Sequence, residues 1–181
     1  MLEERLKGLK LVSYKVGRPT FYRVPPRSAL DVLIGATFEG VRRRGKYLIL
    51  ILSGGRELTM HLGMSGRIVL GDKGPHTRFE FQVEGQTVTF NDARRFGQVG
   101  CKLPLFGPEP LTADFHPDYL FQATRKRKAP IKSMLMNQAV VAGLGNIYAT
   151  EALFQAGIRP ARAGGNLSRK DCGKLVTAVK K

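Results

Sequence analysis

The sequence has 181 residues, 43% of them hydrophobic, which is enough for one good core or two small ones. Lys and Arg total 30 against 14 Asp and Glu, so the net charge is +16, and this excess favours a nucleic acid as partner. No apolar run is long enough to span a bilayer, and the start "MLEERLKGLK" lacks the apolar stretch of a secretion signal, so we expect a soluble, cytoplasmic protein.

Two other classes of partner are disfavoured. The basic residues are spread along the chain instead of gathering on one amphipathic helix, and Trp is absent, which argues against a membrane surface. Cys101 and Cys172 lie far apart and form no CxxC pair, and the three histidines show no ligand spacing. We therefore expect no disulfide and no metal site.

Up to about residue 106, short β-rich runs alternate with turns. The clearest hairpin is "TRFEFQVEGQTVTF" at 77–90, because apolar residues alternate on both sides of "EGQ". The first half therefore predicts an antiparallel sandwich or barrel. Its expected strands and their turns cover residues 46–52, 58–64, 65–75, 77–90 and 97–103.

"GPEPL" at 107–111 ends the β pattern, and from about Asp114 the apolar residues recur at helical spacing. A helical domain is therefore expected over 113–181. The basic run "RKRK" at 125–128 falls between two of its helices, and in most proteins such a run is only a solvated face. The expected helices cover residues 114–124, 129–142, 147–156 and 168–181, the last capped by Ser168.

The stretch "AGLGNIYATEALFQAG" at 142–157 places two glycines and an asparagine before an amphipathic helix. We expect Asn146 to be the N-cap and Gly157 to end the helix. Gly143 and Gly145 allow backbone amides to converge at the positive end of the helix dipole, which favours an anion site. Turn-and-cap chemistry alone would also explain the pattern. A dinucleotide fingerprint is excluded, because the third glycine and the later acidic residue are missing.

Five motifs occur in this order along the chain: "RRRGKYLIL", "HLGMSGR", "NDARRFG", "GPEPL" and "VVAGLGNIYATEALFQAGIRP". Together they resemble the formamidopyrimidine-DNA glycosylase and endonuclease VIII family of base-excision repair enzymes. The resemblance runs from about Leu2 to Lys181 and implies an α+β fold. An antiparallel β-sandwich is expected in residues 1–112 and a helix-two-turn-helix domain in residues 113–181, with DNA bound between them.

The resemblance implies that Met64, Arg94 and Phe96 are the intercalating side chains. An enzyme that acts on a base must extract it from the stack, which leaves a gap to fill. Met is flexible, Phe can wedge between bases and Arg can hydrogen-bond the base left without a partner. Taken singly, Met64 and Phe96 could be core residues and Arg94 a surface charge.

Further positions match phosphate contacts of the family. Lys46 could instead be a solvated strand-end lysine, and it is also a candidate to support catalysis. Lys132 and the run at 125–128 could add nonspecific charge. By this resemblance the remaining DNA-binding residues are Lys46, His61, Arg95, Gly145, Asn146, Ile147 and Tyr148.

The chain departs from the family pattern at both ends. Family members begin with a proline, whose secondary amine attacks the sugar C1′, and a glutamate, whereas this chain opens "MLEERLKG". We therefore expect the nucleophile upstream of Met1, and Glu3 and Glu4 on a helix surface. The chain also stops before the family's zinc finger, so we expect no cofactor, no metal and little or no activity of the chain itself.

Two functions of different classes follow. One is a bifunctional glycosylase and AP lyase that excises oxidised purines, since "DARRFG" looks closer to the formamidopyrimidine branch. The alternative is a non-catalytic duplex-DNA-binding module. In either case we expect a monomer that binds double-stranded DNA with damaged bases or abasic sites. An RNA-binding or ribosome-associated protein is a weaker reading, because it leaves Met64, Arg94 and Phe96 unexplained.

Overall fold

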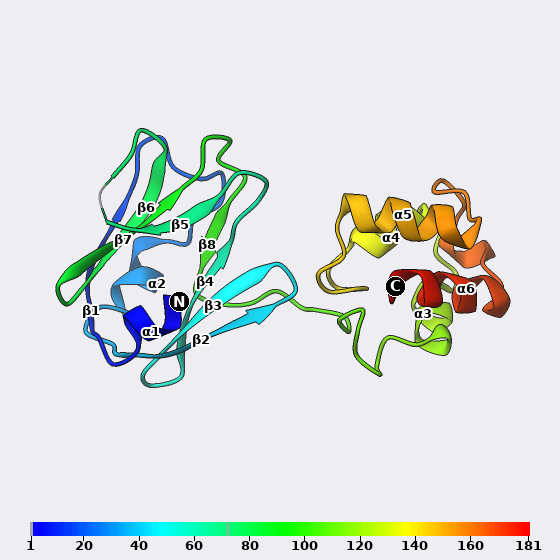
Figure 1. Cartoon of the computed structure of the whole chain (residues 1–181), viewed down its shortest axis with the longest axis horizontal. Helices are drawn as coiled ribbons and strands as arrows, with labels where there is room; N and C mark the ends of the chain where they lie inside the picture. The colour runs from blue at the N-terminus through cyan, green and yellow to red at the C-terminus, as the bar shows by residue number, and fades with distance from the viewer. Residues whose placement is uncertain (1, 72) are drawn as a thin grey trace. The chain divides into compact units, whose positions relative to one another are not determined.

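The computed structural model describes residues 2–71 and 73–181 and divides the chain into two compact units (Figure 1). The first unit extends to Leu103 and the second is Pro104–Lys181. This boundary falls before the one expected after residue 112, because the connecting segment bonds to the helical unit. The amide of Gly107 donates to the carbonyl of Gln138 at 2.9 Å, and the amide of Ala142 donates to the carbonyl of Pro108 at 3.0 Å.

The first unit is a sandwich of two four-stranded antiparallel sheets, as the sequence predicts. One sheet has the order β1 (Leu11–Val16), β6 (Thr77–Val83), β7 (Gln86–Asn91) and β5 (Arg67–Leu70). The other has the order β2 (Phe38–Arg44), β3 (Tyr47–Leu52), β4 (Arg56–His61) and β8 (Gln98–Gly100).

Strands β1 and β2 are not among the strands predicted from the sequence. Strand β1 does alternate from Val12 to Val16, a signal that was overlooked, whereas β2 ends in three consecutive arginines and shows no such alternation. Each is nevertheless paired along its length, β1 with β6 and β2 with β3. For β2, tertiary pairing therefore creates a strand that the local pattern does not indicate.

The predicted hairpin is confirmed by the pairing of β6 with β7, in which Phe79 lies opposite Phe90. These rings belong to the core of the first unit, which also holds Leu6 of α1 (Leu2–Leu6) and Leu30 of α2 (Arg27–Asp31). Glu3 and Glu4 are exposed on α1, as expected.

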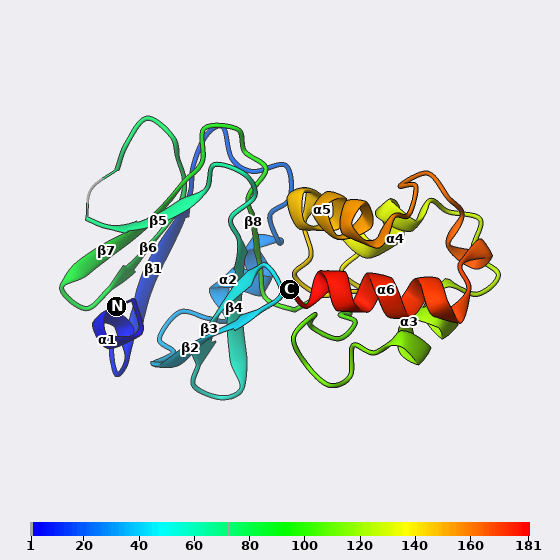
Figure 2. The same cartoon turned by 45° about the vertical axis from the view of Figure 1, so that its right-hand side comes forward.

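The second unit is helical and has its own core. It contains α3 (Pro117–Thr124), α4 (Ile131–Met136), α5 (Asn146–Ala156), the 3-10 turn η1 (Gly164–Asn166) and α6 (Arg169–Val179). Figures 1 and 2 show α5 and α6 side by side, and α3 packs against α6 while α4 packs against α5. No helix among the described residues is long and apolar enough to cross a membrane.

Helix ends follow the sequence signals in α6 but not in α4. Ser168 caps α6, because its hydroxyl accepts from the Asp171 amide at 3.1 Å and its own amide donates to the Asp171 carboxylate at 3.0 Å. Helix α4 ends at Met136 and does not continue through Ala142 as predicted. The amide of Ala142 is instead bonded to the connecting segment at Pro108, which replaces the helical bond.

Candidate nucleic-acid interface

Two loops of the sandwich unit, residues 61–66 and 92–97, pack directly against each other; we call them the paired loops. A Cβ atom added to Gly63 would lie 2.8 Å from the carbonyl carbon of Phe96, so this approach requires glycine. Gly63 also has a φ of +65°, which L side chains rarely adopt.

The carboxylate of Asp92 holds the paired loops together. It accepts hydrogen bonds from the Ser65 hydroxyl at 2.5 Å, the Gly97 amide at 2.7 Å and the Arg94 amide at 3.2 Å. Burial by itself raises the pKa of Asp92, but these bonds and one from the Arg95 amide outweigh it, so the pKa lies below its usual value. Asp92 is therefore an anion that fixes both loops.

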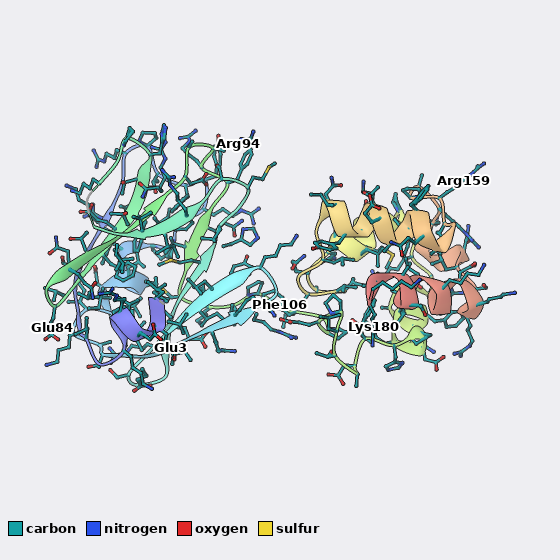
Figure 3. All side chains as sticks on the ribbon, in the orientation of Figure 1. Glu3, Glu84, Arg94, Phe106, Arg159 and Lys180 are labelled. Carbon is teal, nitrogen blue, oxygen red and sulfur yellow. The ribbon has the colours of Figure 1, made fainter. Side chains whose placement is uncertain are left out.

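The paired loops present three exposed side chains that the sequence assigns to intercalation. Met64 is 73% exposed and Phe96 is 50% exposed, which excludes a core role for either. Arg94 extends outward from the loop after β7, and its Nη1 lies 3.6 Å from the Met64 sulfur (Figure 3). The paired loops thus carry two exposed apolar side chains and a guanidinium, a combination suited to insertion between stacked bases.

Lys46 directly precedes strand β3, and His61 is the last residue of the neighbouring strand β4. Tyr47 pairs with His61 across the two strands, and their rings are 5.0 Å apart. Partial burial, and then the charge of Lys46, lower the pKa of His61, while burial lowers the pKa of Lys46. The Gly63 amide donates to His61 Nδ1 at 3.1 Å, so the neutral ring carries its proton on Nε2.

The turn before α5 is braced by Gln138, which the sequence analysis missed. The Gly143 amide donates to its side-chain oxygen at 2.7 Å, and its side-chain nitrogen donates to the carbonyl of Leu144 at 3.2 Å. Gly143 has a φ of +89°. One glutamine side chain thus spans the backbone of the turn.

The prediction that Asn146 is the N-cap of this helix is wrong. Gly145 occupies that position, without a side-chain bond, and Asn146 is the first helical residue. The side chains of Asn146, Ile147 and Tyr148 are exposed, the last two at 74% and 73%. Among the described residues no acceptor takes the amide hydrogens of Asn146 and Ile147, which are the free donors of a helix start. The prediction that Gly157 ends the helix is confirmed by its left-handed φ of +67°.

Comparison with known proteins identifies the family. The formamidopyrimidine-DNA glycosylase N-terminal domain model matches residues 1–99, and the formamidopyrimidine-DNA glycosylase H2TH domain model matches residues 106–181. The chain belongs to the formamidopyrimidine-DNA glycosylase family. Curated relatives include the formamidopyrimidine-DNA glycosylases of Ruegeria pomeroyi, 39% identical, and Thioalkalivibrio sulfidiphilus, 42% identical; each match covers 99% of this chain and 71% of the relative.

Solved structures of the family have the same fold. MutM (Fpg) of Thermus thermophilus is 33% identical with a TM-score of 0.80, over 98% of this chain and 68% of that one. Lactococcus lactis Fpg in complex with abasic-site DNA is 30% identical with a TM-score of 0.80, over 99% and 71%. The expected α+β fold and DNA-repair glycosylase family are therefore confirmed.

The predicted site residues of this glycosylase-family chain form two groups, one in each unit. Sequence reasoning missed Asp92 and Gln138, although each lies within or beside a quoted motif and carries the polar groups that a turn needs. The sandwich unit holds Lys46, His61, Met64, Arg94, Arg95 and Phe96, and the helical unit holds Gly145, Asn146, Ile147 and Tyr148. Among the described residues no three His, Cys, Asp or Glu side chains gather to hold a metal ion.

Proposed function

We propose that this chain binds duplex DNA at a damaged base or abasic site and probes the base stack with Met64, Arg94 and Phe96. The observation that carries the proposal is the pair of loops locked by Asp92, which presents these three side chains outward. Lactococcus lactis Fpg, which this chain resembles, has been solved with DNA containing an abasic site and with DNA containing Fapy-dG.

Phosphate binding would be divided between the two units. In the sandwich unit, Lys46 supplies a cation, and neutral His61 supplies an Nε2–H donor because its Nδ1 is occupied by Gly63. In the helical unit, the start of α5 supplies backbone amides, with the Asn146 side chain beside them. These contacts would fix the register of the protein on DNA without reading sequence.

We further propose an oxidised purine as the lesion of the parent activity, a bifunctional glycosylase and AP lyase. The support is that the N-terminal domain model of formamidopyrimidine-DNA glycosylase matches residues 1–99, the part that carries "NDARRFG". Lactococcus lactis Fpg in complex with DNA containing Fapy-dG is a structural neighbour with a TM-score of 0.81.

The 181-residue polypeptide by itself would grip and probe DNA without efficient chemistry. The nucleophile that the family resemblance implies is a proline with a free secondary amine, and all ten prolines of this sequence are internal amides. A primary amine such as that of Lys46 supports only slow background cleavage. A second candidate function is a non-catalytic duplex-DNA-binding module, which would use the same paired loops and the same helix start.

The test measures binding and covalent trapping on the same duplexes. Fluorescence anisotropy measures the affinity of the chain for each duplex. The affinity should be higher for a duplex with one abasic-site analogue than for the undamaged duplex. With about six phosphate contacts, the affinity should fall about a thousandfold between roughly 50 and 200 mM salt. Phe96→Ala should reduce the preference for the abasic duplex, whereas Phe154→Ala, an exposed aromatic on α5, should not.

Borohydride should trap almost no adduct between this polypeptide and DNA with a natural abasic site, when the rate is compared with that of Lactococcus lactis Fpg. Trapping at a rate similar to that of the relative would show that the chain contains its own nucleophile. Equal affinity for damaged and undamaged duplexes would contradict the probing role of the paired loops.

A further inference from the structure

Tyr22 lies in the segment between β1 and α2 and is 67% exposed. The residues on either side of it are fixed. Phe21 is buried, with its ring centroid 4.5 Å from that of Phe90. The backbone of Arg23 forms an isolated β-bridge with Gln98. The backbone of Tyr22 is therefore held beside the end of the second paired loop.

The side chain of Tyr22 contacts two residues of that loop. The Arg95 Nη2 donates to the tyrosine hydroxyl at 3.0 Å, and the guanidinium carbon of Arg95 lies 4.6 Å from the ring centroid. The ring of Phe96 lies 6.2 Å from the ring of Tyr22 at an interplanar angle of 31°. Tyr22 thus contacts both Arg95 and Phe96, and Phe96 is one of the side chains proposed to insert between bases.

The backbone of Arg95 needs such support. Its φ of +61° is in the left-handed region, which is unfavourable for a residue with a Cβ and persists where the surroundings hold it. Tyr22 holds the Arg95 side chain by a hydrogen bond and a cation–π contact. These two interactions help to keep the backbone of Arg95 in the left-handed conformation. This backbone conformation in turn sets the directions of Arg94 and Phe96.

We infer that Tyr22 is a positioning residue for the DNA-probing side chains: through Arg95 it holds the loop in the conformation in which Phe96 enters the base stack. The inference rests on the proposed function. An exposed ring that is already oriented loses less conformational freedom on insertion than a free one, which favours the inserted state. The partner group on DNA is a nucleobase that has lost its stacking neighbour.

Tyr22 is not required for the fold in the way that its neighbours are. Its ring is mostly in water, so truncation leaves no buried cavity, and Phe21 supplies the anchor to the core. A substitution at Tyr22 should therefore change the behaviour of Phe96 while the thermal unfolding midpoint stays close to that of the parent.

The experiment uses an abasic-site duplex with the fluorescent base 2-aminopurine beside the site. The amplitude of the fluorescence change at saturating protein reports the fraction of complexes with Phe96 inserted, and the titration gives Kd separately. Tyr22→Leu should lower the inserted-to-uninserted ratio about three- to tenfold, the range expected for loss of an aromatic pair. Tyr22→Phe keeps the ring and should stay within about threefold of the parent.

A double-mutant comparison separates positioning from a direct contact of Tyr22 with DNA. In a Phe96→Leu background, Tyr22→Leu should have little further effect, because Tyr22 acts through Phe96. Phe154→Leu, an exposed aromatic of the helical unit, serves as the matched control and should behave as the parent.

The outcomes distinguish failure of the proposed function from failure of the inference about Tyr22. A parent chain that does not bind the abasic duplex overturns the proposed function. A parent chain that binds and inserts, but whose Tyr22→Leu variant keeps the parent amplitude, overturns the inference alone. Full additivity of Tyr22→Leu and Phe96→Leu also overturns it, since a positioning residue has nothing to position once Phe96 is gone.

Discussion

The Asn146 side chain makes no capping bond, because helix α5 uses Gly145 at that position. Its exposed amide lies beside amides that have no acceptor in the described chain. A residue that the helix does not need for its own stability is therefore placed where a phosphate would complete the hydrogen bonding of the helix start.

Asn146→Asp should weaken DNA binding by about tenfold or more, because a carboxylate would face the phosphate at close range. The stability should hold or rise by a few tenths of a kcal/mol, because an acidic residue in the first turn of a helix is favourable. Binding is measured by anisotropy and stability by urea unfolding.

Gln155→Glu is the matched control, since it makes the same change of charge near the other end of α5, where the side chain is also exposed. If Asn146→Asp and Gln155→Glu weaken binding equally, only the total charge matters, and the phosphate contact at the turn is wrong.

At the scale of elements, the paired loops depend on Asp92, a buried carboxylate that ties the loop after β4 to the loop after β7. Three glycines allow the approach: a Cβ on Gly63, Gly66 or Gly97 would lie less than 3 Å from the neighbouring loop or the rings beneath it. The charged carboxylate and its donors therefore hold the two loops against each other.

Asp92→Asn should destabilise the fold by about 1–3 kcal/mol at neutral pH, because a buried set of donors loses part of its acceptor. Since the pKa of Asp92 is lowered on folding, its carboxylate stabilises the protein above the unfolded pKa of about 4. This contribution is lost as the pH falls through the folded pKa. The stability gap between parent and variant, measured by urea unfolding, should therefore narrow below about pH 4.

Asp31→Asn provides the control, because Asp31 is an exposed carboxylate that accepts from the Tyr14 hydroxyl at 2.6 Å. Asp31→Asn should lower the free energy of unfolding by about 0.5 kcal/mol or less. A gap for Asp92→Asn that stays constant from neutral to acid pH would show that the charge of Asp92 does not hold the loops.

At the scale of the whole molecule, the chain consists of two compact units, and each has its own hydrophobic core. Cys101 and Cys172 belong to different units, and His61 Nδ1 is taken by a backbone amide. We therefore predict that the purified chain carries no stoichiometric zinc, as measured by elemental analysis after dialysis. One zinc per chain that resists dialysis would contradict this prediction.

The sequence by itself determined the family and the broad architecture. Alternating apolar residues, helical spacing and the Ser168 capping box are local signals, so β6, β7, α5 and α6 could be located from short stretches. Met64, Arg94 and Phe96 could be assigned to intercalation by family resemblance, because the motifs that contain them are contiguous in the chain. The turn before α5 lies in another such motif.

Only the tertiary structure decided which residues hold these motifs in place. Tyr22 reaches Arg95 across 73 positions, and Asp92 reaches Ser65 across 27, so no local pattern contains either contact. After α4 ends at Met136, the amide of Ala142 finds its acceptor at Pro108, far back in the chain. The physical reason is the same in each case: a hydrogen bond between distant segments exists only after the chain has brought them together.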